Sequence, residues 1–179
     1  MFYEVRAKTT VRVDPSLLSE EPKSSIFSAL NKQLEGYISA DAGFVIGVTE
    51  ILNIGEGIII PGDGAAFYET EFIFLSFLPE MQEVVLGKIS DITNFGVFIN
   101  IGAVDAMIHV SQTMDDYVSM GKQKILTGKQ SKQVLKVGDR CKGRIIAISY
   151  KDITNPKIGL TMRQPGLGSL QWEAKKRKK

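Results

Sequence analysis

Polar and apolar residues alternate along the first stretch of the chain, from Phe2 to Val13, and many of them are β-branched. This pattern is typical of a strand with one buried face. Asp14-Pro15 ends the alternation and also suits the start of a helix, with aspartate as the cap and proline in the first turn. We therefore predict a strand over residues 2–13 and expect a helix to follow it.

Apolar residues then recur at the spacing of one helix face, namely at Ile26, Leu30, Leu34 and Tyr37. Pro22 interrupts a helix that would start at Asp14-Pro15, so we expect the main helix to begin near Lys23. Gly36 stands where that helix should end. The N-terminal region is thus predicted to contain one amphipathic helix packed on a sheet.

Residues 43–78 form a strand-like stretch that is broken by a glycine-dense tip at residues 55–64. We predict two strands that flank a long turn. The second strand, residues 66–78, is apolar at many consecutive positions: Phe72, Ile73, Phe74, Leu75, Phe77 and Leu78. Such a strand is either packed inside its own domain on both faces or covered by another chain, and both alternatives are open at this point.

After Pro79-Glu80 the pattern restarts with short strands at residues 83–90, 95–101, 105–109, 139–150 and 157–162. Five strands in about eighty residues are typical of a small Greek-key barrel of the OB type. The insert at residues 119–133, rich in lysine, glutamine and serine, is predicted to be a mobile loop. The predicted fold is an α+β N-terminal domain, with an antiparallel sheet, one main helix and a glycine-rich tip loop, followed by an all-β five-stranded barrel.

Charge divides the chain into two unlike parts. Residues 1–80 carry five basic and twelve acidic side chains, a net charge of −7, whereas the rest carries seventeen basic and eight acidic ones, a net charge of +9. Such asymmetry indicates different partners, and a polyanion is the natural ligand of the basic part. Residues 175–179, Lys-Lys-Arg-Lys-Lys, are predicted to be a solvated tail.

Several function classes are disfavoured by what the sequence lacks. Cys141 is the only cysteine and His109 the only histidine, so neither a disulfide nor a zinc site of the usual type can form within the chain. The adjacent Asp115-Asp116 are expected to face solvent, and no carboxylate cluster for two metal ions is evident. The sequence has no Gly-Lys-Ser/Thr phosphate loop and no apolar run of about 18 residues for a membrane. We expect a cytoplasmic protein without a catalytic residue, a cofactor or a membrane contact.

The basic part contains a recognisable motif, made of Gly87, the Phe-Gly-x-Phe unit at residues 95–98 and the Ile-His-x-Ser end at residues 108–111. This motif resembles the S1 motif of ribosomal and RNA-processing proteins. Further similarity lies at residues 137–139, 144–148 and 158–163. The resemblance covers essentially all of residues 82–164 and implies an S1-like OB barrel that binds single-stranded RNA.

Single-stranded RNA exposes unstacked bases, so a binding sheet needs aromatic faces for the bases and cations for the phosphates. We predict Phe95, Phe98 and His109 as the stacking platform, and Lys88, Arg144 and Arg163 as the cations. In a regular strand Phe95 and Phe98 would face opposite sides, so one of them is a core residue unless Gly96 supplies a bend. A purely structural role for His109 is also open.

A second resemblance extends over nearly the full length of the chain and rests on residues 42–64, 79–81, 108–118 and 160–165. It is a resemblance to a family of RNA polymerase subunits that comprises archaeal E-prime and its eukaryotic counterpart, the seventh subunit of polymerase II. It implies a non-catalytic stalk subunit of DNA-directed RNA polymerase, in the archaeal cytoplasm or, for a eukaryotic member, in the nucleus. The implied partners are the polymerase core subunits, a small helical stalk partner, initiation factors and nascent single-stranded RNA.

The glycine-dense tip is the docking element that this resemblance implies. Its candidate residues are Gly55, Gly57, Ile58, Ile59, Pro61, Gly62, Asp63 and Gly64. Glycines allow positive φ values and close backbone approach, and consecutive isoleucines are unfavourable in a solvated turn. The alternative is that these isoleucines form an ordinary buried strand.

Three segments are therefore expected: residues 1–80 as the docking domain, residues 81–165 as the RNA-binding barrel and residues 166–179 as a basic C-terminal tail. A free-standing S1-type RNA-binding factor in translation or RNA decay is the alternative function, because the barrel by itself fits both. A nuclease would need metal-binding carboxylates that the sequence does not show.

Overall fold

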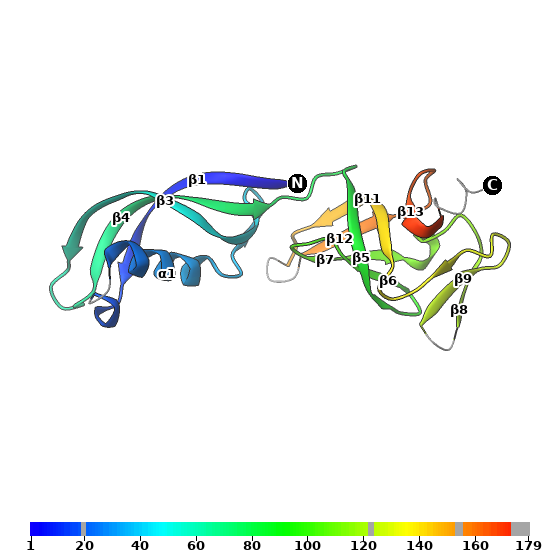
Figure 1. Ribbon diagram of the computed structural model, residues 1–179, viewed down its shortest axis with the longest axis horizontal. Coiled ribbons are helices and arrows are strands. Elements are labelled where there is room, and N and C mark those ends of the chain that lie inside the picture. The colour runs from blue at the N-terminus through cyan, green and yellow to red at the C-terminus, as the bar shows by residue number, and fades with distance from the viewer. Residues whose placement is uncertain (19–20, 122–123, 153–155, 173–179) are drawn as a thin grey trace. The chain divides into compact units, whose positions relative to one another are not determined.

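The computed structural model of the protein describes residues 1–18, 21–121, 124–152 and 156–172 (Figure 1). The chain divides into two compact units, Met1–Leu78 and Pro79–Lys179. Each unit has its own sheets and its own buried residues. Within the described residues, no helix is both long enough and apolar enough to span a bilayer.

The first unit is a four-stranded antiparallel sheet with a helix packed against one face. Its elements are β1 (Phe2–Val13), the 3-10 helix η1 (Pro15–Leu17), α1 (Pro22–Leu34), β2 (Ile38–Ser39), β3 (Gly43–Ile59) and β4 (Ala66–Phe77). The strands lie in the order β1-β4-β3-β2, and Figure 1 shows α1 running along the sheet. The predicted strand over residues 2–13 and the predicted main helix on a sheet are both confirmed.

Helix α1 begins one residue earlier than predicted, at Pro22, because proline suits the first turn of a helix, where its missing N–H is not needed. Ile26 and Leu30 are fully buried in the core that α1 shares with the sheet, as their spacing predicts. The prediction that Tyr37 continues this face is wrong, because the helix stops before it and Tyr37 is 51% exposed. Gly36 takes a φ of +70° and turns the chain away at that point.

Strand β3 points every third residue, rather than every second, into the core under α1. Val45, Val48 and Ile51 are buried there, and Ile54 is partly buried. The pairing of β3 with β4 shifts register after each of these four residues. Each shift is a bulge that leaves an extra outward residue on β3, which bends the strand and increases its twist.

Strand β4 is central in the sheet, between β1 and β3, and its two faces differ. Phe72 and Phe74 are buried in the core with α1. Ile73 and Leu75, on the other face, are only half-buried. One face of this apolar strand is therefore packed within its own unit, whereas the other face stays partly open in that unit taken by itself.

The second unit contains a closed five-stranded barrel. Its strands are β5 (Val84–Ile92), β6 (Gly96–Asn100), β7 (Asp105–His109), β11 (Arg140–Ser149) and β12 (Lys157–Thr161). They pair in the order β12-β7-β6-β5-β11, and β11 also pairs with β12, which closes the ring. The core of the barrel includes Ile89, Val97, Ile99, Ile108, Ile145 and Leu160. The predicted OB-type barrel is confirmed.

The described residues between β7 and β11 form strands, so the prediction of a mobile loop at residues 119–133 is wrong for them, while residues 122 and 123 lie outside the described residues. After the 3-10 helix η2 (Val110–Gln112) this stretch forms β8 (Val118–Gly121), β9 (Ile125–Gly128) and β10 (Val134–Leu135), a three-stranded sheet in the order β10-β9-β8 that we call the insert sheet. Leu126 and Leu135 pair across β9 and β10 and are 1% and 0% exposed. Burial of these two leucines supplies the apolar contact that a polar loop would lack.

The chain after β12 returns to the barrel. A short strand, β13 (Gly168–Ser169), pairs with β11, and the indole Nε1 of Trp172 donates a hydrogen bond to the carbonyl oxygen of Val134 at 3.0 Å. These contacts extend the packed unit beyond residue 165. The basic tail predicted at residues 175–179 lies outside the described residues.

Candidate nucleic-acid interface

Phe95, Phe98 and His109, the predicted stacking platform, line one pocket whose other walls come from β7, β11 and β12. This aromatic pocket has a volume of about 570 Å³, and Met107 and Ile146 contribute further walls. Phe95 is 53% exposed, so its ring is open to a ligand. The structure therefore brings the three platform residues together.

Phe95 and Phe98 reach the same pocket because β6 begins only at Gly96. Phe95 lies in the turn before the strand, where its carbonyl oxygen accepts a hydrogen bond from Val110 N at 2.9 Å. The two rings meet edge to face, with their centroids 6.1 Å apart. Gly96 is needed for a different reason than a bend, since a Cβ at this position would lie 2.4 Å from the carbonyl oxygen of Ile108.

His109 has one ring nitrogen engaged in the fold and a ring that is open to the pocket. Its Nδ1 caps η2 by accepting a hydrogen bond from Ser111 N at 3.3 Å, and it also lies 2.8 Å from Ser111 Oγ. Because Nδ1 accepts from a backbone N–H, the neutral ring carries its proton on Nε2. The residue is exposed and lines the aromatic pocket. A structural role and a ligand-binding role are thus compatible.

The predicted cations Lys88 and Arg144 lie away from this pocket. Lys88 is exposed on β5, paired with Asn100, and Arg144 is half-buried on β11 between Val84 and Thr161. Neither side chain lines the aromatic pocket. The Nε of Arg144 is buried and makes no hydrogen bond within the part of the chain that the structure describes. The six predicted residues therefore do not form a single cluster.

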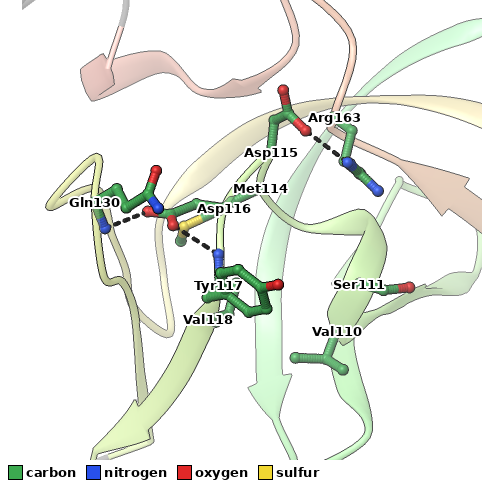
Figure 2. Close-up of a pocket in the computed structure, with 9 residues that line it drawn as sticks. All are labelled: Val110, Ser111, Met114, Asp115, Asp116, Tyr117, Val118, Gln130 and Arg163. Carbon is green, nitrogen blue, oxygen red and sulfur yellow. Dashed lines mark hydrogen bonds and ion pairs between the residues drawn. The ribbon is translucent and has the colours of Figure 1, made fainter.

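Arg163, the third predicted cation, belongs to a second pocket of about 490 Å³ beside η2 (Figure 2). We call it the η2 pocket. Its walls come from η2 itself, from the start of the insert sheet and from the chain after β12, and they include Ser111, Tyr117 and Gln130. Arg163 forms an exposed ion pair with Asp115 at 2.6 Å on this pocket. This predicted cation is therefore held by a carboxylate of its own chain.

Asp116 links the chain just before β8 to the turn between β9 and β10 of the insert sheet. Its carboxylate accepts hydrogen bonds from the backbone N–H groups of Tyr117, Gln130 and Ser131, at 2.6, 2.8 and 2.8 Å, and from Ser131 Oγ at 2.9 Å. These bonds, that from Ser131 N foremost, lower the pKa of Asp116. The expectation that both aspartates face solvent holds for Asp115 but is wrong for Asp116, whose oxygens are engaged in the fold.

The aromatic ring of Tyr117 is a feature of this region that the sequence predictions missed. Tyr117 is 76% exposed although the backbone around it is fixed, since Lys129 N donates to its carbonyl oxygen at 2.9 Å. The signal in the sequence is weak: one aromatic residue stands in front of a stretch of lysines and glutamines. Only the folding of the insert makes this ring part of a surface.

The N-terminal unit presents the predicted docking tip, but its turn is shorter than expected. Strand β3 runs on to Ile59, so only residues 60–65 turn the chain into β4. Ile58, Ile59 and Ile60 are 65%, 64% and 49% exposed. The alternative of a buried strand is therefore wrong for these isoleucines, and the long turn from residue 55 is wrong as well. The tip is a β-hairpin with solvated aliphatic side chains.

An ion pair holds the turn of the tip to β1. Arg12 donates hydrogen bonds to the two carboxylate oxygens of Asp63, at 2.6 and 3.1 Å. The hydrogen bond from Arg12 lowers the pKa of Asp63. Gly62 and Gly64 have φ values of +99° and +70°, which glycine adopts without a steric penalty. The turn thus depends on its glycines for shape and on Arg12 for attachment.

Two family models match the chain. The first describes the SHS2 domain found in the N terminus of Rpb7p/Rpc25p/MJ0397 and matches residues 8–64. The second describes the S1 RNA binding domain and matches residues 78–152. The first match falls in the unit that carries the tip, and the second in the unit that carries the barrel.

Relatives match along nearly the whole chain. DNA-directed RNA polymerase subunit Rpo7 of Sulfolobus acidocaldarius is 37% identical over 173 residues, which cover 96% of this chain and 94% of the relative. The protein of the same name from Saccharolobus solfataricus is 34% identical, and the match covers 96% of this chain and 97% of the relative. DNA-directed RNA polymerase III subunit RPC8 of Bos taurus is 30% identical over 60% of this chain and 53% of the relative.

Proposed function

Because the chain belongs to the family of the archaeal DNA-directed RNA polymerase subunit Rpo7, we propose that it serves as a non-catalytic stalk subunit of such a polymerase. The tip of the N-terminal unit docks on the polymerase core, and the S1 barrel binds nascent single-stranded RNA. Membership of the family makes other polymerase subunits its partners. The small helical stalk partner and initiation factors are further partners in this proposal, with the cytoplasm as the site of action.

The aromatic pocket is the observation that carries the RNA-binding part of the proposal. Stacking needs ring faces that are open to solvent and held in place, and Phe95, Phe98 and His109 provide three rings around one pocket. The volume of about 570 Å³ lies within the range of roughly 300–1,000 Å³ that is typical of ligand sites. Aromatic stacking tolerates any base, so the expected sequence preference is weak.

The exposed isoleucines support the docking part. Three consecutive aliphatic side chains, Ile58 to Ile60, are about half or more exposed at the end of a hairpin, and burying a fully exposed side chain of this kind is favourable by about 1.5–3 kcal/mol. Exposed apolar patches of this kind mark protein contacts. The tip lies in the acidic part of the chain, which makes a nucleic acid an unfavourable partner for it.

A free-standing RNA-binding factor gains no support from a particular observation. It would account for the aromatic pocket but would leave Ile58 to Ile60 exposed without a partner. The whole-length similarity to polymerase subunits also favours the stalk assignment.

A reconstituted polymerase that contains this chain tests the proposal. Transcripts that carry photoreactive thiouridine should crosslink to peptides around the aromatic pocket, and Phe95→Ala should reduce the crosslink. Phe27→Ala, at a phenylalanine of α1 that is 39% exposed, is the matched control. Failure of the chain to co-purify with the large polymerase subunits would refute docking. Co-purification without any transcript crosslink to the barrel would refute the RNA-binding part.

A further inference from the structure

The insert sheet is a folded basic element whose role the S1 fold does not explain. Residues 117–138 contain five lysines and no acidic residue. Within the described part of this stretch, Lys124, Lys129, Lys132 and Lys136 are all exposed. Lys124 forms an ion pair with Asp91 at 2.6 Å, whereas the other three have no carboxylate partner among the residues that the structure describes. Free cations concentrated on one small element favour a polyanionic ligand.

Tyr117 adds an aromatic face to these cations. Tyr117 is 76% exposed, yet its backbone N–H and that of Ser131 both donate hydrogen bonds to the Asp116 carboxylate. The position of Tyr117 is therefore fixed before any ligand binds. Gly128 packs closely against the Asp116 carboxylate, because a Cβ at this position would lie 2.6 Å from Asp116 Oδ2. A rigid, solvated ring beside lysines meets the two requirements of a single-strand binding surface, which are stacking and phosphate contact.

The η2 pocket connects Tyr117 with the aromatic pocket. His109 and Gln112 line the aromatic pocket, while Val110 and Ser111, the residues between them in the chain, line the η2 pocket. Three residues of chain span at most about 11 Å, so the two pockets are near neighbours on the barrel surface. OB folds occupy about 4–16 nucleotides of a single strand, which is more than one pocket accommodates.

From this arrangement we infer that Tyr117 and the lysines of the insert sheet form a second contact surface for single-stranded RNA. The RNA leaves the aromatic pocket, crosses η2 and stacks one base on Tyr117 in the η2 pocket (Figure 2). Its phosphates then lie along Lys129 and Lys132. The inference rests on the proposed RNA binding of the barrel and extends it from one pocket to a path. It also gives the insert sheet a function that requires it to be folded.

Two RNA lengths measured against the full-length chain test this path. An oligouridylate of about 4 nucleotides fits the aromatic pocket alone, whereas one of about 16 nucleotides also reaches the insert sheet. Tyr117→Ala should weaken binding of the long RNA roughly 5- to 100-fold in fluorescence anisotropy and leave the short RNA unchanged. Tyr117→Phe keeps the ring and should bind both RNAs like the wild type. Tyr37→Ala, at another exposed tyrosine, is the matched control.

The lysines have a separate readout in the salt dependence of binding. The double variant Lys129→Gln/Lys132→Gln should reduce the magnitude of the slope of log affinity against log salt by about 1.4 for the long RNA and leave the slope for the short RNA unchanged. Lys23→Gln/Lys32→Gln on α1 is the control with the same change of charge.

The outcomes separate this inference from the proposed function. If Tyr117→Ala leaves the long RNA bound as tightly as before while Phe95→Ala weakens both RNAs, the second surface is refuted and the RNA-binding barrel stands. If Tyr117→Ala weakens both RNAs equally, Tyr117 acts on the aromatic pocket and the path is refuted as well. If the wild type binds neither RNA, the RNA-binding function fails together with the inference.

Discussion

The tip and the barrel both expose large apolar side chains, but of different kinds and in different electrostatic surroundings. Ile58 and Ile59 at the tip are aliphatic and belong to the part of the chain with a net charge of −7. Phe95 and Tyr117 on the barrel are aromatic and belong to the part with a net charge of +9. Aliphatic side chains gain free energy only by burial against a shaped apolar groove, whereas aromatic rings also stack on bases. A similar degree of exposure therefore fits the protein contact proposed for one unit and the RNA contact proposed for the other.

The two surfaces are also held in different ways. At the tip, Asp63 is bound by the guanidinium of Arg12, so the attachment is an exposed ion pair. In the insert sheet, Asp116 is bound mainly by backbone N–H groups. Exposed ion pairs are screened by salt, while hydrogen bonds to backbone N–H groups within one turn are less sensitive to it. The tip is thus expected to loosen at high ionic strength before the insert sheet does.

The largest expected effect concerns the tip. Ile58→Asp/Ile59→Asp places two charges where aliphatic burial is proposed and should reduce incorporation into the polymerase core at least roughly a hundred-fold. The binding of short RNA by the isolated chain should not change. Co-purification with the core subunits and anisotropy with RNA measure the two properties.

Ile46→Asp is the matched control for that variant, because Ile46 is also on β3 and is 48% exposed. If both variants lose incorporation into the polymerase core to the same extent, the docking surface is not confined to the tip. If the tip variant assembles normally, the assignment of a protein partner to the aliphatic surface is refuted.

A smaller effect is expected at the aromatic pocket. Phe95→Ala removes one exposed ring and should weaken RNA binding roughly 5- to 100-fold, with little loss of stability, because the side chain is 53% exposed. Incorporation into the polymerase should stay intact, which is the reverse of the result expected for the tip. An unchanged affinity for RNA would contradict the proposed platform.

Much of the fold could be predicted from the sequence because the strands of the barrel follow local patterns. The strand at residues 105–109 agrees with β7 at both ends, and the predicted helix agrees with α1 to within one residue at its start. Strand β3 departs from its expected form because bulges change its inward period from two to three, which a pattern of alternation does not reveal. The tip turn is shortened for the same reason, since bulged pairing continues to Ile59.

The candidate site could be predicted only in part. The platform residues lie close together because the S1 motif places Phe95 just before β6, Phe98 within it and His109 at the end of the neighbouring β7. The insert sheet was not predictable, since its core depends on Leu126 pairing with Leu135 across a polar stretch. Asp116 accepts hydrogen bonds from backbone N–H groups 14 and 15 positions further along the chain, so no local sequence pattern predicts these bonds. The position of Tyr117 on the surface depends on these hydrogen bonds of Asp116.

The third prediction compares the two carboxylates through pH and salt. Hydrogen bonding lowers the pKa of Asp116 below its usual range, and the hydrogen bond from Arg12 does the same to the pKa of Asp63. A carboxylate whose pKa is depressed in the folded state adds stability above its unfolded pKa and loses it as pH falls through the folded value. Asp116→Asn and Asp63→Asn should therefore be less stable than the wild type at pH 7, and the differences should begin to shrink at about pH 4 and vanish only once the pH falls below the folded pKa values.

Urea unfolding of these variants at low and high salt distinguishes the two attachments. The loss of unfolding free energy in Asp63→Asn, relative to the wild type, should shrink in molar salt, because Asp63 is held by the positive charge of Arg12. The deficit of Asp116→Asn should persist. Equal salt dependence in both variants would contradict the proposed difference between the two attachments.

The smallest expected effect is a gain of RNA binding at Asp115. Its carboxylate is 76% exposed and holds Arg163, which is 46% exposed, at 2.6 Å in the η2 pocket. An exposed ion pair of this kind contributes little, so a phosphate competes with it, and Asp115→Asn should raise the affinity for long RNA roughly 1.5- to 5-fold. Asp41→Asn, an exposed carboxylate of the N-terminal unit, controls for the change in net charge. A gain in both variants would reflect net charge alone, whereas a loss in Asp115→Asn would mean that the ion pair orients Arg163 for RNA instead of competing with it.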